Sequence, residues 1–103
     1  MHEHEEVEEI GKLQLPRKGE LFAIADQLFG GSRIKVICSD SKSRLARIPG
    51  KLKKKLWIRT GDLVIIKPWE FQNDKADLVW RYTRTQAAHL SRKGLLPKEL
   101  DVF

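Results

Sequence analysis

The sequence predicts an all-β domain with a C-terminal helix, and three observations support this prediction. The chain of 103 residues has room for one domain. Short apolar runs separated by turn-forming residues recur as far as residue 83, which is typical of closely connected strands. The pattern then changes to helical spacing, and this change begins at a Thr-x-x-Gln capping sequence.

Five segments are predicted to form strands, from their apolar content and the turns between them. They are residues 20–29, 33–39, 44–48, 63–67 and 77–83. The first is apolar on both alternating faces, as expected of a strand that is covered on both sides. In the second, the side chains alternate between the two faces of the strand. Ile34, Val36 and Cys38 share one face, and Arg33, Lys35 and Ile37 share the other. The third has no clear parity, and in the fifth we expect Leu78, Trp80 and Tyr82 to share a face.

Turns and caps fix the ends of these elements. Residues 30–32, Gly-Gly-Ser, predict a tight hairpin in which glycine supplies the positive φ, and residues 40–43 predict a second hairpin. Thr83 and Gln86 form the capping sequence of the helix. Gly94 is suited to its C-terminal end, and Pro97 prevents extension.

Five short strands, two early hairpins, a long third connection and a trailing helix together match the five-stranded Greek-key barrel known as the OB-fold. We divide the chain into an acidic flexible tail (1–17), the barrel (18–83) and the C-terminal helix and tail (84–103). The apolar residues after the helix are expected to pack back on the helix or the barrel, although a contact with a partner remains an alternative.

Charge is distributed unevenly along the chain. The net charge is +6, but residues 1–10 contain five glutamates and no lysine or arginine. The other 93 residues carry all 20 basic groups and nine of the 14 acidic groups, a net charge of +11. A basic body of this kind favours nucleic acid as the partner. The alternative, a solvated surface of an unrelated domain, usually mixes the two signs.

The positive charge is concentrated between Asp40 and Asp62, a stretch without any acidic residue. Its cations are Lys42, Arg44, Arg47, Lys51, Lys53, Lys54, Lys55 and Arg59. Arg33, Lys35 and Arg81 are candidates to join them across the sheet. Trp57 lies within this stretch and either stacks on an unpaired base or packs to anchor its loop; the same alternatives apply to Trp69 and Phe71.

Enzymatic chemistry is not indicated by the sequence. The glycine-rich phosphate-binding patterns and the C-x-x-C zinc pattern are absent. Cys38 lies on the apolar parity of its strand and is expected to be a core residue rather than a nucleophile. We therefore predict a non-enzyme without metal or cofactor. A single cysteine and the lack of an apolar signal or spanning segment favour a cytoplasmic protein without a membrane anchor.

Two long motifs resemble those of translation initiation factor 1A from archaea and eukaryotes. Residues 48–58, IPGKLKKKLWI, look like the signature of that family, and residues 72–77, QNDKAD, are similar to its second motif. Their spacing agrees, as does the stretch KGLLP at 93–97, so the likeness covers about residues 18–100. Pro49-Gly50 and Pro68-Trp69 look archaeal, and the long acidic C-terminal extension of eukaryotic members is lacking.

The resemblance implies a small OB-fold factor that binds 16S ribosomal RNA at the decoding (A) site of the small ribosomal subunit. There it would block premature tRNA entry, support initiator tRNA and start-site selection, and cooperate with other initiation factors, acting as a monomer. By motif match the RNA contact would involve Arg33, Arg44, Lys51, Lys53, Lys54, Lys55 and Trp57. The acidic tail departs from the basic tail of eukaryotic members, so tail functions do not carry over.

Two other functions fit the sequence less well. A general single-stranded RNA chaperone of cold-shock type would carry exposed aromatic side chains on its second and third strands, and residues 33–37 and 44–48 have none. A nucleic-acid enzyme, or a subunit of one, would require a catalytic constellation, which the sequence lacks.

Overall fold

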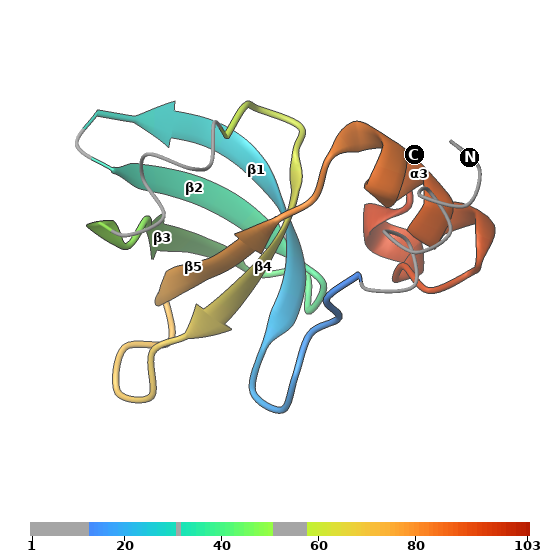
Figure 1. Ribbon diagram of the computed structural model, residues 1–103. Coiled ribbons are helices and arrows are strands. Elements are labelled where there is room, and N and C mark those ends of the chain that lie inside the picture. The colour runs from blue at the N-terminus through green and yellow to red at the C-terminus, as the bar shows by residue number, and fades with distance from the viewer. Residues whose placement is uncertain (1–12, 31, 51–57) are drawn as a thin grey trace.

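The computed structural model describes residues 13–30, 32–50 and 58–103. Its strands are β1 (Leu21–Phe29), β2 (Arg33–Cys38), β3 (Ser43–Arg47), β4 (Leu63–Pro68) and β5 (Lys75–Arg81). Helix α3 (Arg84–Arg92) and the short 3₁₀ helix η1 (Lys98–Leu100) follow. Figure 1 shows the barrel on one side of the molecule and α3 with the C-terminal end on the other.

The five strands close into a barrel in the order β1-β2-β3-β5-β4. All neighbouring pairs are antiparallel except β3 and β5, which run parallel and place Leu45 opposite Lys75 and Arg47 opposite Asp77. β3 and β5 can run parallel because β4 lies between them in the chain and runs antiparallel to β5. The predicted OB-fold barrel with a C-terminal helix is confirmed.

Two apolar clusters explain why β4 is buried on both faces. Val64 and Ile66 point into the barrel, where they meet side chains of β2 such as Ile34 and Val36. Leu63 and Ile65 point the other way and pack with Tyr82, with Ala87 and Leu90 of α3, and with Leu96 and Leu100. Burial of this second cluster attaches the helix to the barrel, since apolar area removed from water stabilises at about 25 cal/mol per Å².

The fifth strand differs from its prediction in extent and in parity. It begins at Lys75, two residues earlier than expected, because Lys75 and Ala76 pair in parallel with β3. Leu78 lies in the barrel cluster, whereas Trp80 and Tyr82 belong to the outer cluster, so the three do not share a face. An irregularity opposite Ile65 and Ile66 shifts the register by one residue and therefore reverses the parity.

In the first hairpin turn Ser32 has a positive φ, at 71°, and Gly30 does not. Gly31, the other glycine predicted to supply a positive φ, lies outside the described residues. At the second hairpin the positive φ, 69°, falls on Ser41. A positive φ is unfavourable for residues with a Cβ, so both turns are strained. The pairing of the flanking strands β1, β2 and β3 holds the turns in this conformation.

The helix begins and ends as its sequence predicts. The Thr83 hydroxyl accepts the Gln86 N–H, and the Gln86 side chain accepts the Thr83 N–H, which completes the capping box. Gly94 follows the helix with a φ of +70°. Of the C-terminal apolar residues, Leu96 and Leu100 are buried as expected, whereas Leu95 is exposed.

Residues 13 and 14 do not behave as part of a free tail. Leu13 packs against the outer apolar cluster. The backbone carbonyl of Gln14 accepts a hydrogen bond from the buried Tyr82 hydroxyl. The predicted tail boundary at residue 17 is therefore too late by several residues, and residues 1–12 lie outside the described part of the chain.

Candidate nucleic-acid interface

The outer face of β2, β3 and β5 gathers basic side chains from segments far apart in the sequence. Register places Arg33 opposite Arg47, and Lys35 opposite Leu45. The parallel pair then sets Leu45 opposite Lys75. Residues directly opposite one another in a sheet lie on the same face, so four cations from three adjacent strands share this surface. We call this set, Arg33, Lys35, Arg47 and Lys75, the basic face.

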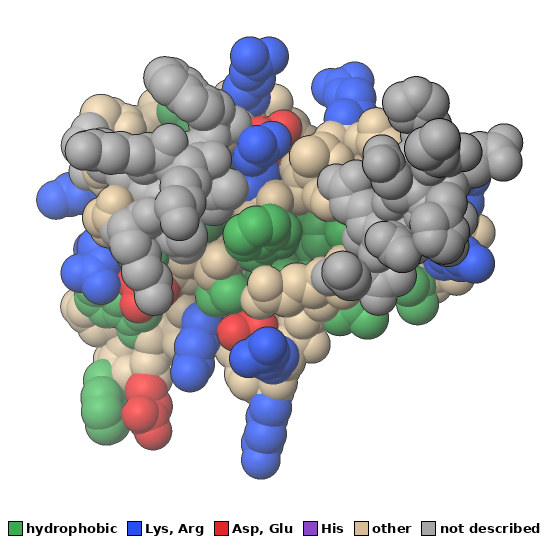
Figure 2. All heavy atoms as spheres, in the orientation of Figure 1, with side chains coloured by type: hydrophobic (Ala, Val, Ile, Leu, Met, Phe, Trp, Pro, Cys, Tyr) green, Lys and Arg blue, Asp and Glu red, His purple; other side chains and the backbone are tan. Residues whose placement is uncertain are grey.

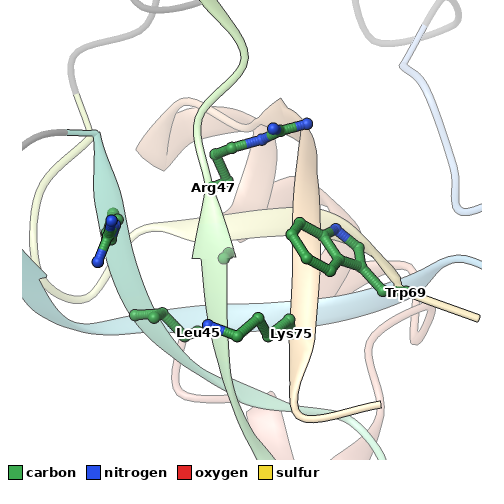
Figure 3. A pocket seen from close by; sticks show the side chains of 6 residues that line it. Leu45, Arg47, Trp69 and Lys75 are labelled. Carbon is green, nitrogen blue, oxygen red and sulfur yellow. The ribbon is translucent and has the colours of Figure 1, made fainter. Parts of the chain in front are cut away.

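A hollow of about 160 Å³ opens on the basic face. It is lined by Arg33, Leu45, Ala46, Arg47, Trp69 and Lys75. Figure 3 shows Arg47 and Trp69 on one side of it and Leu45 and Lys75 on the other. The hollow therefore combines an apolar floor with cationic walls, which suits a ligand that has both flat apolar rings and negative charge.

Arg47 is held in place by two neighbours. Its guanidinium carbon lies 5.6 Å from the centroid of the Trp69 ring, a cation–π distance. Its Nε lies 3.3 Å from Oδ1 of Asp77, the residue opposite it on β5. The Arg47 side chain remains 63% exposed, so both contacts orient the charge without removing it from solvent. Trp69 is thus a supporting residue for Arg47 whether or not it also meets a base.

The other members of the basic face are also open to solvent. Lys35 Nζ lies 3.9 Å from Asp26, a loose pair between side chains that are each more than 40% exposed. Within the described residues, no ion pair involves Arg33 or Lys75. The sequence alone does not indicate Lys75 as a member of this face, because the parallel pairing that brings it beside Leu45 leaves no local pattern.

Arg44 does not belong to an exposed cationic surface, and that prediction is wrong. It lies on the inward parity of β3 with 4% of its surface exposed. Its Nη1 and Nη2 donate to the Asp40 carboxylate at 3.0 and 2.9 Å, and its Nε donates to the Asn73 carbonyl at 2.6 Å. A guanidinium so fully used cannot also bind phosphate, so its role is structural.

Arg59 and Arg81 also lie elsewhere than expected. Both line a second hollow with Arg84, at the junction of the barrel and α3. Arg81 pairs with Val64 at the far end of β5 from Lys75, so it does not join Arg33 and Lys35. Lys42 is exposed in the β2–β3 turn, where its backbone N–H donates to Asp40.

The lysine-rich stretch predicted to dominate the contact falls outside the described residues. This applies to Lys51, Lys53, Lys54, Lys55 and Trp57. The residues that flank it are placed: Ile48 and Ile58 are half-buried against the barrel cluster. Figure 2 shows further basic side chains projecting from several edges of the described surface, so positive charge extends beyond one strand.

Cys38, the one thiol of the chain, lies in the core and not at a reactive site. Cys38 is fully buried, and burial raises the pKa of its thiol, which keeps it protonated and unreactive at neutral pH. Among the described residues, no group of three His, Cys, Asp or Glu is placed to hold a metal ion. No helix in the described ranges is long and apolar enough to span a membrane.

A small OB-fold barrel with an exposed basic face and an aromatic side chain beside it defines a class of polyanion-binding proteins. Comparison with known protein families shows which family of this class the chain matches. The family described as translation initiation factor 1A / IF-1 matches residues 10–102. The chain therefore belongs to this family, and its role is in translation initiation.

Individual relatives agree with this assignment. The chain is 53% identical to translation initiation factor 1A of Thermoplasma volcanium over 97% of its own length and 83% of the relative's. It is 50% identical to the factor of the same name from Methanopyrus kandleri, covering 90% and 84%. Among solved structures, YjeQ from Thermotoga maritima matches with a TM-score of 0.53 and 21% identity, over 63% of this chain and 23% of that one, which supports the fold alone.

Proposed function

We propose that this protein binds ribosomal RNA at the decoding (A) site of the small ribosomal subunit and there supports initiator tRNA and start-site selection. It acts as a monomeric, non-enzymatic factor in the cytoplasm, together with other initiation factors. The family assignment supports the ribosomal setting. The basic face supports RNA, rather than a protein or a small molecule, as the ligand of the chain.

One observation supports this proposal above the others: four cations lie on three adjacent strands at the face that OB-folds use for oligonucleotides. Each phosphate that a lysine or arginine neutralises releases condensed counterions, so such a face supplies affinity without reading sequence. The described residues of the second and third strands offer no aromatic side chain on this face, and the ring beside it, Trp69, lies at a cation–π distance from Arg47.

The same proposal includes cations whose contacts are inferred from the sequence. These are Lys42, Lys51, Lys53, Lys54 and Lys55, with Trp57 as the aromatic member. Lys42 comes directly before β3 in the chain, and the other five residues come after it. Arg44 is left out because its guanidinium is occupied by Asp40 and Asn73.

Co-sedimentation with purified small ribosomal subunits tests the proposal. The protein is mixed with subunits at physiological salt, in the presence and absence of an excess of unstructured single-stranded RNA. Stoichiometric pelleting that survives the competitor is the expected result. Equal loss of the protein to any oligonucleotide would favour the alternative, a general RNA chaperone of cold-shock type.

A matched pair of double variants connects the result to the basic face. R33Q/K75Q removes two charges from the face, and R92Q/K98Q removes two exposed charges from the helical end of the molecule. We expect the first pair to weaken subunit binding by roughly tenfold or more and the second to change it little. Equal effects of the two pairs would show that net charge alone, and not this face, determines binding.

A further inference from the structure

The N-terminal part of the chain is fixed to the body of the molecule beside two arginines. The Tyr82 hydroxyl donates to the backbone carbonyl of Gln14, and Leu13 packs on the outer apolar cluster. Tyr82 comes one position after Arg81 and two positions before Arg84. The Gln14 carbonyl therefore lies one tyrosine side chain away from the backbone segment that carries both arginines.

The two arginines belong to a hollow at the junction of the barrel and the helix. It has a volume of about 290 Å³ and is lined by Arg59, Thr60, Asp62, Arg81 and Arg84. We call it the arginine hollow. Figure 1 shows the β5–α3 connection crossing beside β4 at this place, where the Tyr82 N–H donates to the Leu63 carbonyl at 3.0 Å.

The lining of the arginine hollow carries more positive than negative charge. Asp62 provides its carboxylate, and Oδ2 of Asp62 already accepts the Arg59 backbone N–H at 2.8 Å. Within residues 13–30, 32–50 and 58–103, no ion pair involves Arg59, Arg81 or Arg84. The Nε of Arg81 is buried and has no hydrogen-bond acceptor in the described part of the chain. Because a buried donor without an acceptor is unfavourable, the hollow suits a carboxylate.

Carboxylates are concentrated in the residues that precede Leu13. Five glutamates occur within seven positions, and no lysine or arginine precedes Lys12. We call residues 3–9 the glutamate segment; its acidic members are Glu3, Glu5, Glu6, Glu8 and Glu9. The nearest of them, Glu9, is five positions from Gln14, which corresponds to a reach of up to about 17 Å. Charge and reach therefore both allow this segment to bind the arginine hollow of its own chain.

The basic face is a less favourable target for the same segment. Its member Lys75 lies at the opposite end of β5 from Arg81, six positions away and therefore about 20 Å farther from the attachment at Tyr82. A group held on a short tether has an effective concentration in the millimolar range near its attachment, and this concentration falls with distance. Attachment beside Arg81 thus favours the arginine hollow over the basic face.

We propose that the glutamate segment binds the arginine hollow of the same chain. Its carboxylates pair with Arg59 and Arg84 and accept the Arg81 Nε–H. The contact lowers the positive charge that the free protein presents at the junction of barrel and helix. A loosely held RNA then has less charge to bind, so the contact reduces indiscriminate RNA binding. This consequence rests on the proposed function, whereas the intramolecular contact does not.

A spin label in the glutamate segment tests where the segment binds. E6C introduces an accessible thiol into the full chain, and the buried Cys38 does not compete for the label. A nitroxide at position 6 broadens the amide resonances near it. We expect the strongest broadening at Thr60 and Arg84, and little at Lys75. Salt at about 1 M, where the Debye length is about 3 Å, should remove most of this broadening.

Two double variants of the labelled protein provide a matched comparison. R59Q/R84Q removes two charges from the arginine hollow, and R33Q/K75Q removes two charges from the basic face. We expect the broadening at Thr60 to fall roughly threefold or more in the first and to change little in the second. Equal broadening in the two variants, or broadening centred on the basic face, would overturn the inference.

The consequence for RNA is measured with a second matched pair. E8Q/E9Q removes two carboxylates from the glutamate segment, and E70Q/E99Q removes two exposed carboxylates elsewhere, so both raise the net charge equally. We expect E8Q/E9Q to bind an unstructured single-stranded RNA roughly threefold more tightly than E70Q/E99Q does. Equal affinities would contradict the effect on RNA binding.

The two kinds of measurement separate this inference from the proposed function. Failure of the unaltered protein to bind small ribosomal subunits would contradict the proposed function. The spin-label experiment contains no RNA and no ribosome, so its result depends on the intramolecular contact alone.

Discussion

Arg44 makes two hydrogen bonds to Asn73 in the β4–β5 loop. Its Nε donates to the backbone carbonyl of Asn73 at 2.6 Å, and its Nη2 donates to the side-chain oxygen of Asn73 at 2.7 Å. The remaining donors hold Asp40 in the β2–β3 turn. The Leu45 N–H donates to the Asp74 carbonyl beside it at 2.9 Å. The second family-like motif, residues 72–77, is therefore explained by architecture: it carries the acceptors that a buried arginine needs, and it leads directly into β5.

Replacing Arg44 tests this structural role. R44M keeps much of the side-chain volume but leaves Asp40 and Asn73 without their donor, so we expect a loss of about 2–3 kcal/mol, limited because Asp40 retains water contact. R44K should recover only part of the loss, because a lysine keeps the positive charge but cannot reproduce the planar fork. Urea unfolding measures the difference, and a stable R44M with weakened RNA affinity would instead indicate a direct RNA contact.

The same pair predicts an acid dependence of stability. The hydrogen bonds from Arg44 hold the pKa of Asp40 below its usual value. A depressed folded pKa contributes stability that is present above the unfolded pKa of about 3.9 and is lost as the pH falls through the folded pKa. The stability advantage of the unaltered protein over D40N should therefore be constant above about pH 5 and shrink below about pH 4.

Urea unfolding at pH 6, 4 and 3 provides this measurement for both proteins. D74N serves as a control, because the Asp74 side chain has no described hydrogen bond or ion pair. An advantage over D40N that persists undiminished at pH 3 would contradict the assignment of Arg44 as the cause.

The approximate positions of the strands and the ends of the helix could be predicted because their causes are local. Turn residues, alternation over 33–38 and the Thr83–Gln86 cap are each encoded within a few positions, and the structure retains them. The parity of β5 could not be predicted, because the irregularity opposite Ile65 and Ile66 depends on pairing between strands. The same holds for Lys75, whose place is fixed by its partner Leu45.

The candidate site was harder to predict than the fold, for a reason that Arg44 illustrates. A cation in a basic stretch has the same composition signature whether it faces solvent or loop carbonyls. Its burial depends on acceptors 29 positions away at Asn73. Arg81 and Arg84 show the converse case, since their grouping with Arg59 follows from the closure of the barrel against the helix.

The helix cap predicts a measurable contribution to stability. T83A removes the hydroxyl that accepts the Gln86 N–H and should cost about 1 kcal/mol in the free energy of unfolding. T85A is the matched control, because Thr85 is exposed within the same turn and alanine is the better helix former. Equal stabilities of the two variants in urea would mean that the outer apolar cluster alone fixes the start of α3.

Arg47 distinguishes charge from shape on the basic face. R47Q should lower the salt slope of RNA binding by about one, because one phosphate contact is lost. R47K should keep the slope but weaken binding, since an ammonium lacks the planar guanidinium that lies over Trp69. Filter binding of small-subunit RNA at several salt concentrations measures both effects, with K98Q, far along the chain in η1, as the control. If R47Q and K98Q gave the same slope, Arg47 would serve to pack Trp69 and hold Asp77, and the phosphate contacts would have to come from other cations of the face.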